Sequence, residues 1–317
     1  MFPEPVRARN KIACISVAFN AAGLLPKQLE ALRLQEQPLD EIIVVDNGST
    51  DGTVQFLRDK YPQVTLIALP KNLGIGGALS EGMRYAFQEK RCDLVWLLDD
   101  DSVPAENVLA GLLHGLNSLN GTASKVGVLA PMPINGKTQL SYPGLLWRRG
   151  WVTPEATQTE AVSFVDAVIS SGSLVSKAAV DACGLPRADF FMDFVDFEYC
   201  LRLRRQGFLI GVVHDSRMEH TIGAPRSVRF LWQERTWSDH APWREYYMTR
   251  NQVFTIWTEY PDWKSKLSVV RRLLRHAAGI VLFGEKKFAC LRMMTLGFVD
   301  GRAGRLGIRF VGNSANA

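Results

Sequence analysis

The sequence predicts an α/β protein with a mostly parallel central sheet and a helical carboxy-terminal extension. Between residues 12 and 130, apolar runs of strand character alternate with segments of helical periodicity, and the last third shows helical periodicity alone. Such alternation is typical of βαβ units, in which right-handed crossovers make neighbouring strands parallel. With 317 residues, of which 47% are hydrophobic, the chain is long enough to bury a substantial core.

The expected elements follow one another along the chain in regular order. Strands are expected at residues 12–19, 41–45, 64–69, 94–98 and 126–130, and helices at 25–32, 53–60, 79–87 and 106–119. Residues 131–159 are rich in Pro, Gly, Ser and Thr, which indicates a functional loop. Strand character returns at 162–169 and 208–213, on either side of a helix for which Asp196 is the expected N-cap. We therefore expect a domain of residues 1–225 and a basic helical region of residues 226–317.

An apolar run at residues 94–98 ends abruptly in three carboxylates, Asp99, Asp100 and Asp101. Adjacent acids repel one another unless a cation joins them, and Asp99 and Asp101 point to the same side of an extended segment. Carboxylate oxygens suit Mg²⁺ or Mn²⁺, which can in turn hold phosphate oxygens. This pattern predicts a metal-diphosphate site, and the alternative is a solvated turn in which Asp101 or Ser102 caps the next helix.

Two further polar segments follow predicted strands and therefore lie at the same edge of the sheet, where α/β proteins bind ligands. Asp46 and Asn47 end the strand at 41–45, and Asp51 is expected to cap the helix after it. Glycines 74, 76 and 77 precede a helix, so backbone N–H groups can approach a phosphate there. The pattern is neither a Walker loop nor a dinucleotide fingerprint, so it allows a nucleotide diphosphate without proving one.

Cysteine spacing, the amino-terminal sequence and the net charge limit the classes of protein to which the chain can belong. The five cysteines are scattered and unpaired in spacing, which favours reduced packing residues and the cytoplasm. No apolar run precedes Ile12, so we expect neither a leader nor an anchor. The net charge of +5 suits a nucleic acid, an anionic membrane or a phosphorylated substrate. A nucleic-acid partner is disfavoured, because the basic residues concentrate in the last third without a recognised binding motif.

The last third contains an amphipathic helix. Apolar residues recur every three or four positions between 267 and 282, and basic residues lie largely elsewhere around the helix. The apolar segment is too short to cross a bilayer. We expect it either to pack on the core or to lie on a membrane surface, where anionic lipid would attract its basic residues.

Several motifs in order resemble glycosyltransferase family 2, which has the GT-A fold. They are Phe19-Asn20, Asp46-Asn47-Gly48-Ser49-Thr50-Asp51, Asn72-Leu73-Gly74, Asp99-Asp100-Asp101, the acidic segment 193–198 with Arg202, and His220. The resemblance covers residues 12–223. Within the family, residues 246–251 and Asp300-Gly301-Arg302 are similar to bacterial rhamnosyltransferases, with galactofuranosyltransferases as close relatives.

The resemblance implies a role for each motif residue. Phe19, Asn20, Asn72 and Gly74 would lie against the donor nucleotide, Asp46 would recognise its base, and Asp100 would assist contacts to sugar or ribose. Asp99 and Asp101 would bind the metal with His220 as a further ligand, although His220 could equally be a structural histidine. Asp196 would be the catalytic base, with Asp193 and Glu198 as reserves.

The function that the resemblance implies is a metal-dependent inverting glycosyltransferase of the cytoplasm, using Mg²⁺ or Mn²⁺. Residues 12–130 would bind the donor and residues 160–225 the acceptor. The expected reaction moves L-rhamnose from dTDP-rhamnose onto a lipopolysaccharide, O-antigen or other lipid-linked glycan, at the inner face of the plasma membrane if the basic helix contacts lipid.

Two other enzymes remain as alternatives at this point. One is a galactofuranosyltransferase that uses UDP-galactofuranose as its donor. The other belongs to a different class, the nucleotidyltransferases, which would normally carry a glycine-rich loop with Arg and Lys directly after the first strand. In this chain Phe19-Asn20-Ala21-Ala22 occupies that place.

Overall fold

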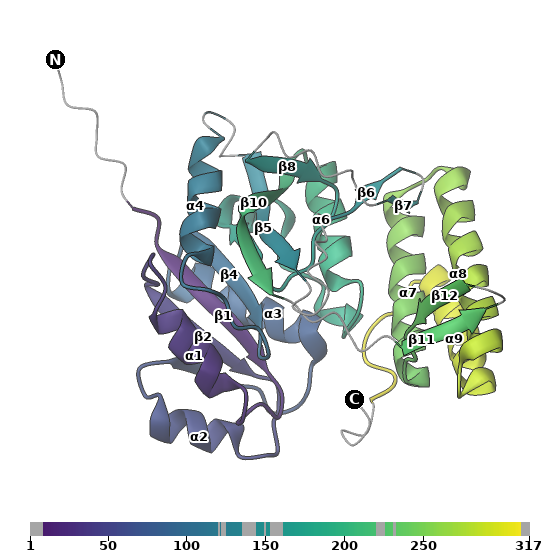
Figure 1. Ribbon diagram of the computed structural model, residues 1–317, viewed down its shortest axis with the longest axis horizontal. Helices are drawn as coiled ribbons and strands as arrows, with labels where there is room; N and C mark the ends of the chain where they lie inside the picture. The colour runs from purple at the N-terminus through teal and green to yellow at the C-terminus, as the bar shows by residue number, and fades with distance from the viewer. Residues whose placement is uncertain are drawn as a thin grey trace.

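The computed structural model describes residues 9–119, 121, 125–134, 144–148, 150–152, 161–219, 226–230 and 233–311. Figure 1 shows an α/β part, which contains the sheet and the amino-terminal helices, beside a group of three carboxy-terminal helices. Two short hairpins accompany this helical group. They pair β6 (Leu146–Trp147) with β7 (Trp151–Val152), and β11 (Arg226–Phe230) with β12 (Gln233–Trp237).

A mixed, mostly parallel sheet forms the centre of the α/β part. Its strand order is β3-β2-β1-β4-β9-β5-β10-β8, in which β9 and β8 run antiparallel to their neighbours. The sequence prediction of a mostly parallel sheet is therefore confirmed. The strands are β1 (Ile12–Ala18), β2 (Glu41–Asp46), β3 (Thr65–Ala68), β4 (Leu94–Asp99), β5 (Val126–Ile134), β8 (Val162–Val165), β9 (Leu174–Ser176) and β10 (Leu209–Glu219).

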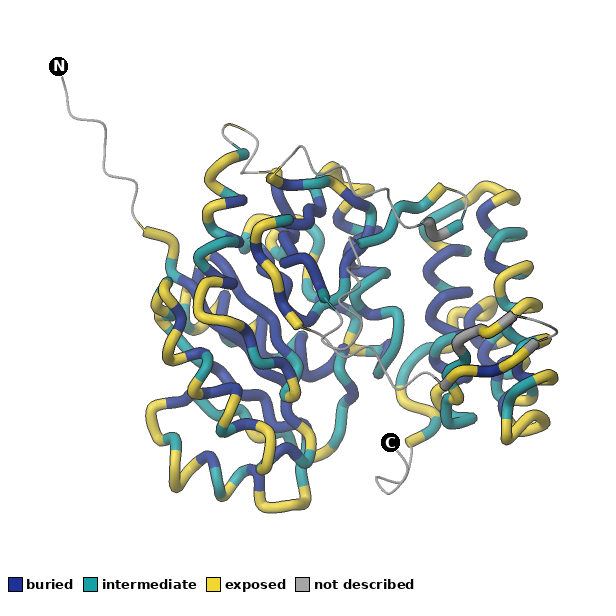
Figure 2. Tube along the Cα trace, viewed as in Figure 1, coloured by how far each residue is buried: buried dark blue, intermediate teal, exposed yellow. Residues whose placement is uncertain are grey.

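Helices cover both faces of the sheet, so its central strands are buried on both sides, as parallel strands usually are. In β1, Ile15 packs into one apolar cluster and Cys14 into the other. Figure 2 shows the strands buried and the outer turns of the helices exposed. One face is covered by α1 (Leu25–Arg33), α2 (Thr53–Lys60) and α4 (Val108–Ser118), the other by α3 (Gly74–Arg84), α5 (Lys177–Cys183) and α6 (Val195–Arg205).

The carboxy-terminal helices are α7 (Pro242–Glu259), α8 (Trp263–Phe283) and α9 (Lys287–Arg302). Helices α7 and α9 cross at glycines of α9. A Cβ added at Gly297 would lie 2.5 Å from the carbonyl oxygen of Tyr246, and one at Gly301 would lie 2.5 Å from that of Arg250. The absence of a side chain at these two positions is therefore what lets the backbones of the two helices approach.

Several expected boundaries were wrong, among them the ends of β8 at Val165 rather than residue 169 and of β10 at Glu219 rather than residue 213. Helix α3 begins at Gly74 rather than residue 79 and continues into a π turn, Tyr85–Glu89. Strand β5 extends through two prolines to Ile134, since β9 pairs with it only at Val128 and Leu129 and leaves that edge open beyond them. Helix α6 has Phe194, not Asp196, at its N-cap, because the left-handed backbone of Phe194 starts the helix earlier.

Among the described ranges, none of the helices is both long and apolar enough to pass through a bilayer.

The crossing of α7 and α9 generates a stability prediction. Replacing Gly301 by Val should force the helices apart and lower the free energy of unfolding by about 1–3 kcal/mol, the usual effect of overpacking. Thermal unfolding followed by circular dichroism measures the effect. Gly23→Val is the matched control, because a Cβ at this exposed turn meets no atom within 4 Å. Equal shifts in the two variants would contradict this account of the crossing.

Candidate active site

The candidate site is built at the carboxyl ends of three parallel strands. Strand β1 lies between β2 and β4, with Ala18 opposite Asp46 and Val17 opposite Asp99. Asp46 ends β2, and Asp99 ends β4. The two carboxylates therefore flank the end of β1, which is the edge where α/β proteins bind ligands.

Asp46 is a buried carboxylate with one oxygen satisfied and one left over. Its side chain Oδ2 accepts the backbone N–H of Ser49 at 3.0 Å. Its Oδ1 is buried and has no hydrogen-bond partner in the described part of the chain. An unpartnered buried acceptor costs about 1–3 kcal/mol. A ligand that donates an N–H to this oxygen would remove that cost.

The segments after β1 and β2 hold one another in place. Asn20 has a φ of 53°, a left-handed conformation that asparagine tolerates better than most residues. Its backbone N–H donates to Ser49 Oγ at 2.8 Å, and its side-chain Oδ1 accepts the N–H of Thr50 at 2.8 Å. Phe19, 38% exposed, precedes it. These contacts fix the wall of the site next to Asp46.

Two asparagines connect this wall to the start of α3. Asn47 Nδ2 donates to Asn72 Oδ1 at 3.1 Å, and the same oxygen accepts the N–H of Gly74 at 2.7 Å. Gly74 has a φ of 73°, and a Cβ there would lie 2.0 Å from the carbonyl oxygen of Phe191. Only glycine fits this position, since both the backbone conformation and the space forbid a side chain.

The acidic triplet is anchored by its backbone. Gln28 Nε2, on α1, donates to the carbonyl oxygens of Asp99 and Ser102, the latter at 2.8 Å, and Ser102 Oγ contacts Ser171 Oγ at 2.7 Å. Asp101 and Ser102 do not cap α4, which begins at Val108. The alternative of a helix-capping turn is therefore wrong for these residues.

Burial and mutual repulsion disturb the ionisation of the triplet. Burial, reinforced by the charge of Asp101, raises the pKa of Asp99 to about 6. Burial likewise raises the pKa of Asp100 to about 6, although its Oδ2 accepts the N–H of Phe19 at 3.0 Å, which opposes the rise. Burial is the larger cause in both cases and repulsion between the neighbouring carboxylates adds to it, and a bound cation would oppose both effects.

The acids present fit a divalent cation that shares its coordination with a phosphate. Within the described ranges, no three or more His, Cys, Asp or Glu side chains are grouped closely enough to hold a metal by themselves. Mg²⁺, however, is usually bound by one or two carboxylates together with substrate phosphates and water. Asp99 and Asp101 supply such a pair. His220, the expected further ligand, follows the end of β10 and lies outside the described residues.

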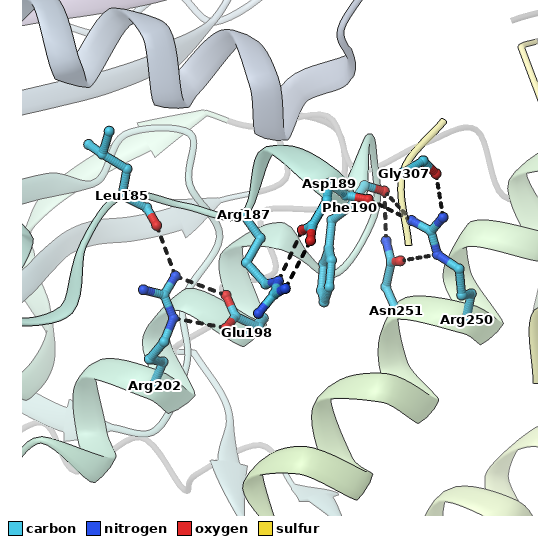
Figure 3. Close-up of polar contacts among 9 residues, drawn as sticks. All are labelled: Leu185, Arg187, Asp189, Phe190, Glu198, Arg202, Arg250, Asn251 and Gly307. Atoms are coloured by element: carbon cyan, nitrogen blue, oxygen red, sulfur yellow. Dashed lines mark hydrogen bonds and ion pairs between the residues drawn. The ribbon is translucent and has the colours of Figure 1, made fainter. Parts of the chain in front are cut away.

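The acidic segment before and within α6 holds three carboxylates, two of which form ion pairs with arginines. Asp193 pairs with Arg244, whose Nη2 lies 3.0 Å from Oδ1. Glu198 pairs with Arg202, whose Nε lies 2.9 Å from Oε1 (Figure 3). Asp196 has no ion pair in the described part of the chain, and its side chain accepts the N–H of Phe197 at 2.9 Å and is also stabilised by its own backbone N–H.

Asp196 is electrostatically coupled to the acidic triplet. Burial raises the pKa of Asp196 to about 6, the Phe197 N–H opposes the rise, and the charges of Asp193 and Asp99 add to it. Asp196 also lines a small cavity together with Leu97 of β4 and Ser170. The structure therefore brings Asp196 toward the carboxyl end of β4.

Sequence reasoning missed the buried polar residues that support the site. Gln28 is fully buried and stands among the apolar positions of α1, a signal that was visible beside Leu25, Leu29 and Leu32. Asn251 is also fully buried, and it contacts the segment before Asp196 from α7. Nothing local in the sequence shows that a residue 58 positions away makes this contact.

The fold and the comparisons with known proteins together define the class of protein. Residues 13–152 match the family model described as Glycosyl transferase family 2. This part of the chain is similar to that family, and the enzyme is a glycosyltransferase.

The names of two relatives indicate different sugars. The chain is 28% identical to the dTDP-rhamnosyl transferase RfbF of Shigella flexneri, over 89% of this chain and 93% of that protein. It is also 28% identical to the galactofuranosyltransferase GlfT1 of Mycolicibacterium smegmatis, over 67% of this chain and 71% of the relative.

Solved structures confirm the fold. TarS residues 1–349 of S. aureus superpose with a TM-score of 0.57 at 16% identity, covering 92% of this chain and 80% of TarS. The mannosyltransferase PcManGT from Pyrobaculum calidifontis, in complex with GDP-Man and Mn²⁺, gives a TM-score of 0.55 at 15% identity and covers 94% of this chain and 88% of its own.

Proposed function

We propose that this enzyme is a metal-dependent, inverting rhamnosyltransferase that moves L-rhamnose from dTDP-rhamnose onto a lipid-linked glycan in the synthesis of lipopolysaccharide or a related polysaccharide. The observations that support the proposal are that Asp46 and Asp99 flank the end of β1 at one edge of the sheet, and that Asp196 shares a cavity with Leu97 of β4. The similarity to RfbF, which extends over most of both chains, supports the sugar. Transfer of galactofuranose from UDP-galactofuranose is the second candidate, favoured by the similarity to GlfT1.

The donor half of the site would be formed by residues 12–130. The free Oδ1 of Asp46 suits the imide N–H that thymine and uracil both carry, so this contact favours dTDP or UDP without choosing between them. Phe19, Asn20, Asn72 and Gly74 would surround the nucleotide, and Asp100 would contact ribose or sugar.

A divalent cation, Mg²⁺ or Mn²⁺, would be held by Asp99 and Asp101 with the donor phosphates, and His220 is a candidate further ligand. When bound, the cation would neutralise charge that develops on the leaving diphosphate. The contribution of the protein is to hold the backbone that carries the two carboxylates, since Gln28 donates to the carbonyl oxygens of Asp99 and Ser102 and Ser171 accepts the N–H of Asp99.

The acceptor half would be formed by residues 160–225, with Asp196 as the base. Inversion in a single displacement needs one group to take the proton of the attacking hydroxyl. Asp193 and Glu198 are less available for this role, because arginines already pair with their carboxylates. Asp196 is free of such a partner in the described part of the chain, and its raised pKa makes it a better proton acceptor than an ordinary aspartate.

The carboxy-terminal region, residues 226–317, would contact the acceptor or the inner face of the plasma membrane. Val269 and Ile280 of α8 are buried, whereas Leu274 on the opposite side is 64% exposed. Leu282, 54% exposed, shares that outer side. The same side of α8 carries the exposed residues Arg271 and Arg275, and the exposed residues Lys286, Lys287 and Arg292 follow at and after the start of α9. Apolar side chains beside cations suit an anionic lipid surface.

A donor screen tests the reaction. Purified protein is incubated with dTDP-rhamnose, UDP-galactofuranose and control nucleotide sugars, and nucleotide release is measured with Mn²⁺ or Mg²⁺ and with EDTA. We expect dTDP-rhamnose to be turned over with either metal, and EDTA or the substitution Asp101→Asn to reduce turnover at least 100-fold. Full activity in EDTA would reject the metal, and a preference for UDP-galactofuranose would select the second candidate.

The role of Asp196 has its own test. Asp196→Asn keeps the shape of the side chain and an oxygen for the Phe197 N–H, but it cannot take a proton. The turnover number should fall by about 10²-fold or more, with donor affinity little changed.

The parent enzyme should also lose turnover as the pH falls through about 6, because the raised pKa of Asp196 leaves the base protonated below that value. Profiles of kcat against pH for both proteins check this. Near-normal turnover of the variant would move the base to Asp193 or Glu198.

Vesicle sedimentation tests the membrane contact. The parent should bind anionic vesicles at low salt and detach as salt rises, since exposed charges are screened within about 10 Å at 0.1 M. Replacing Arg271 and Arg275 together by Gln should weaken binding several-fold. The matched control replaces two exposed cations of α2, Arg58 and Lys60, by Gln. Equal binding by both double variants would speak against this surface.

A further inference from the structure

The segment that leads into α6 has a strained backbone. Phe191, Asp193 and Phe194 have φ values of 65°, 55° and 65°, although none of them is glycine. Each such residue costs on the order of 1–3 kcal/mol and persists only where its surroundings enforce the conformation. We call residues 190–194 the entry loop, because it ends directly before Val195 and Asp196 at the start of α6.

Two neighbouring side chains of α7 hold the entry loop by its carbonyl oxygens (Figure 3). Asn251 Nδ2 lies 3.0 Å from the carbonyl oxygen of Phe190, 2.7 Å from that of Met192 and 2.8 Å from that of Asp193. Arg250 Nη2 donates to the carbonyl oxygens of Asp189 at 3.1 Å and Phe190 at 2.9 Å. Three carbonyl oxygens of the loop, those of Phe190, Met192 and Asp193, are thus held by two adjacent side chains.

The opposite side of the entry loop contacts the donor half of the site. The carbonyl oxygen of Phe191 accepts the N–H of Gly76 at 3.2 Å. The same oxygen fills the space next to Gly74, where a Cβ would lie 2.0 Å from it. A shift of the entry loop would therefore disturb the start of α3 as well as Asp196.

Burying the charge of Arg250 has a free-energy cost that a purely structural role would not require. It is fully buried and has no ion pair in the described ranges. Its guanidinium donates Nη1 to the carbonyl oxygen of Gly307 at 2.5 Å and Nε to Asn251 Oδ1 at 2.8 Å, and it lies 4.7 Å from the centre of the Tyr247 ring. Well-packed apolar residues often stabilise a fold as well as a buried charge does. An apolar residue could not replace the planar set of N–H donors that the guanidinium of Arg250 supplies.

We propose that Arg250 and Asn251 are positioning residues, which hold the strained entry loop and thereby set the place of Asp196 relative to the donor. This inference rests on the proposed role of Asp196 in sugar transfer. It makes α7, in the carboxy-terminal region, a required part of the active centre without any contact to substrate.

The test uses Asn251→Asp in the full chain, because this change keeps the size of the side chain. The new carboxylate retains its oxygen for Arg250 Nε but offers no N–H to the three carbonyl oxygens. The matched control is Thr255→Val, one turn later on α7, where the buried hydroxyl has no hydrogen-bond partner in the described residues. Thermal unfolding and circular dichroism establish that both variants fold.

Three measurements separate positioning from general stability. Amide hydrogen exchange of residues 189–196 should rise at least tenfold in Asn251→Asp, with exchange in β1, β2 and β4 unchanged. The turnover number for transfer should fall at least 30-fold, whereas the Kd for dTDP with Mn²⁺ should stay within threefold. Thr255→Val should match the parent in all three measurements within twofold.

A folded Asn251→Asp variant with parental exchange or parental turnover would overturn the proposal. Arg250→Lys is the milder second variant, for which we expect a 3- to 10-fold lower turnover number at unchanged dTDP affinity. If neither variant folds, the pair serves stability and the proposal is wrong. If the parent transfers no sugar at all, the proposed function fails, and hydrogen exchange alone decides whether the pair holds the loop.

Discussion

The parallel pairing of β1 with β2 on one side and β4 on the other is the constraint on which the site depends. It sets Ala18 opposite Asp46 and Val17 opposite Asp99, so two carboxylates that are far apart in the chain end at one edge. Both faces of these strands are buried, and alternate residues of β1 pack into two different apolar clusters, so a slip by one residue would exchange the side chains between the clusters. The acidic site is thus a consequence of the same packing that stabilises the sheet.

The sheet and its acidic edge could be predicted from the sequence because both follow from local pattern. Apolar runs predicted the first five strands. Asp46 and Asp99 were predicted at the edge of the sheet because each follows such a run. The start of α6 was misplaced, because no rule of composition predicts left-handed conformations at Asp193 and Phe194. The segment is contacted by Asn251 of α7, more than 50 residues further along the chain, which donates to the carbonyl oxygens of Met192 and Asp193.

The structure was also needed to decide which acid near α6 is the best candidate for the catalytic base. The pairing of Glu198 with Arg202 is a helical contact at four residues and was accessible from the sequence. The pairing of Asp193 with Arg244 joins residues 51 positions apart and was not. The roles of Asp193, Asp196 and Glu198 stay predictions, as does that of His220, but the two arginines give a physical reason to rank Asp196 first.

If Asp46 recognises the base as proposed, its Oδ1, which has no hydrogen-bond partner in the described residues, also determines which nucleotides are rejected. In the proposed complex, thymine or uracil would present a donor to this oxygen, whereas cytosine would present the lone pair of its N3. Two acceptors would then face each other in a buried place, and each would go without a hydrogen at a cost of about 1–3 kcal/mol. Discrimination against cytidine donors would therefore come from repulsion by a carboxylate that the fold has already buried, rather than from added attraction to the correct base.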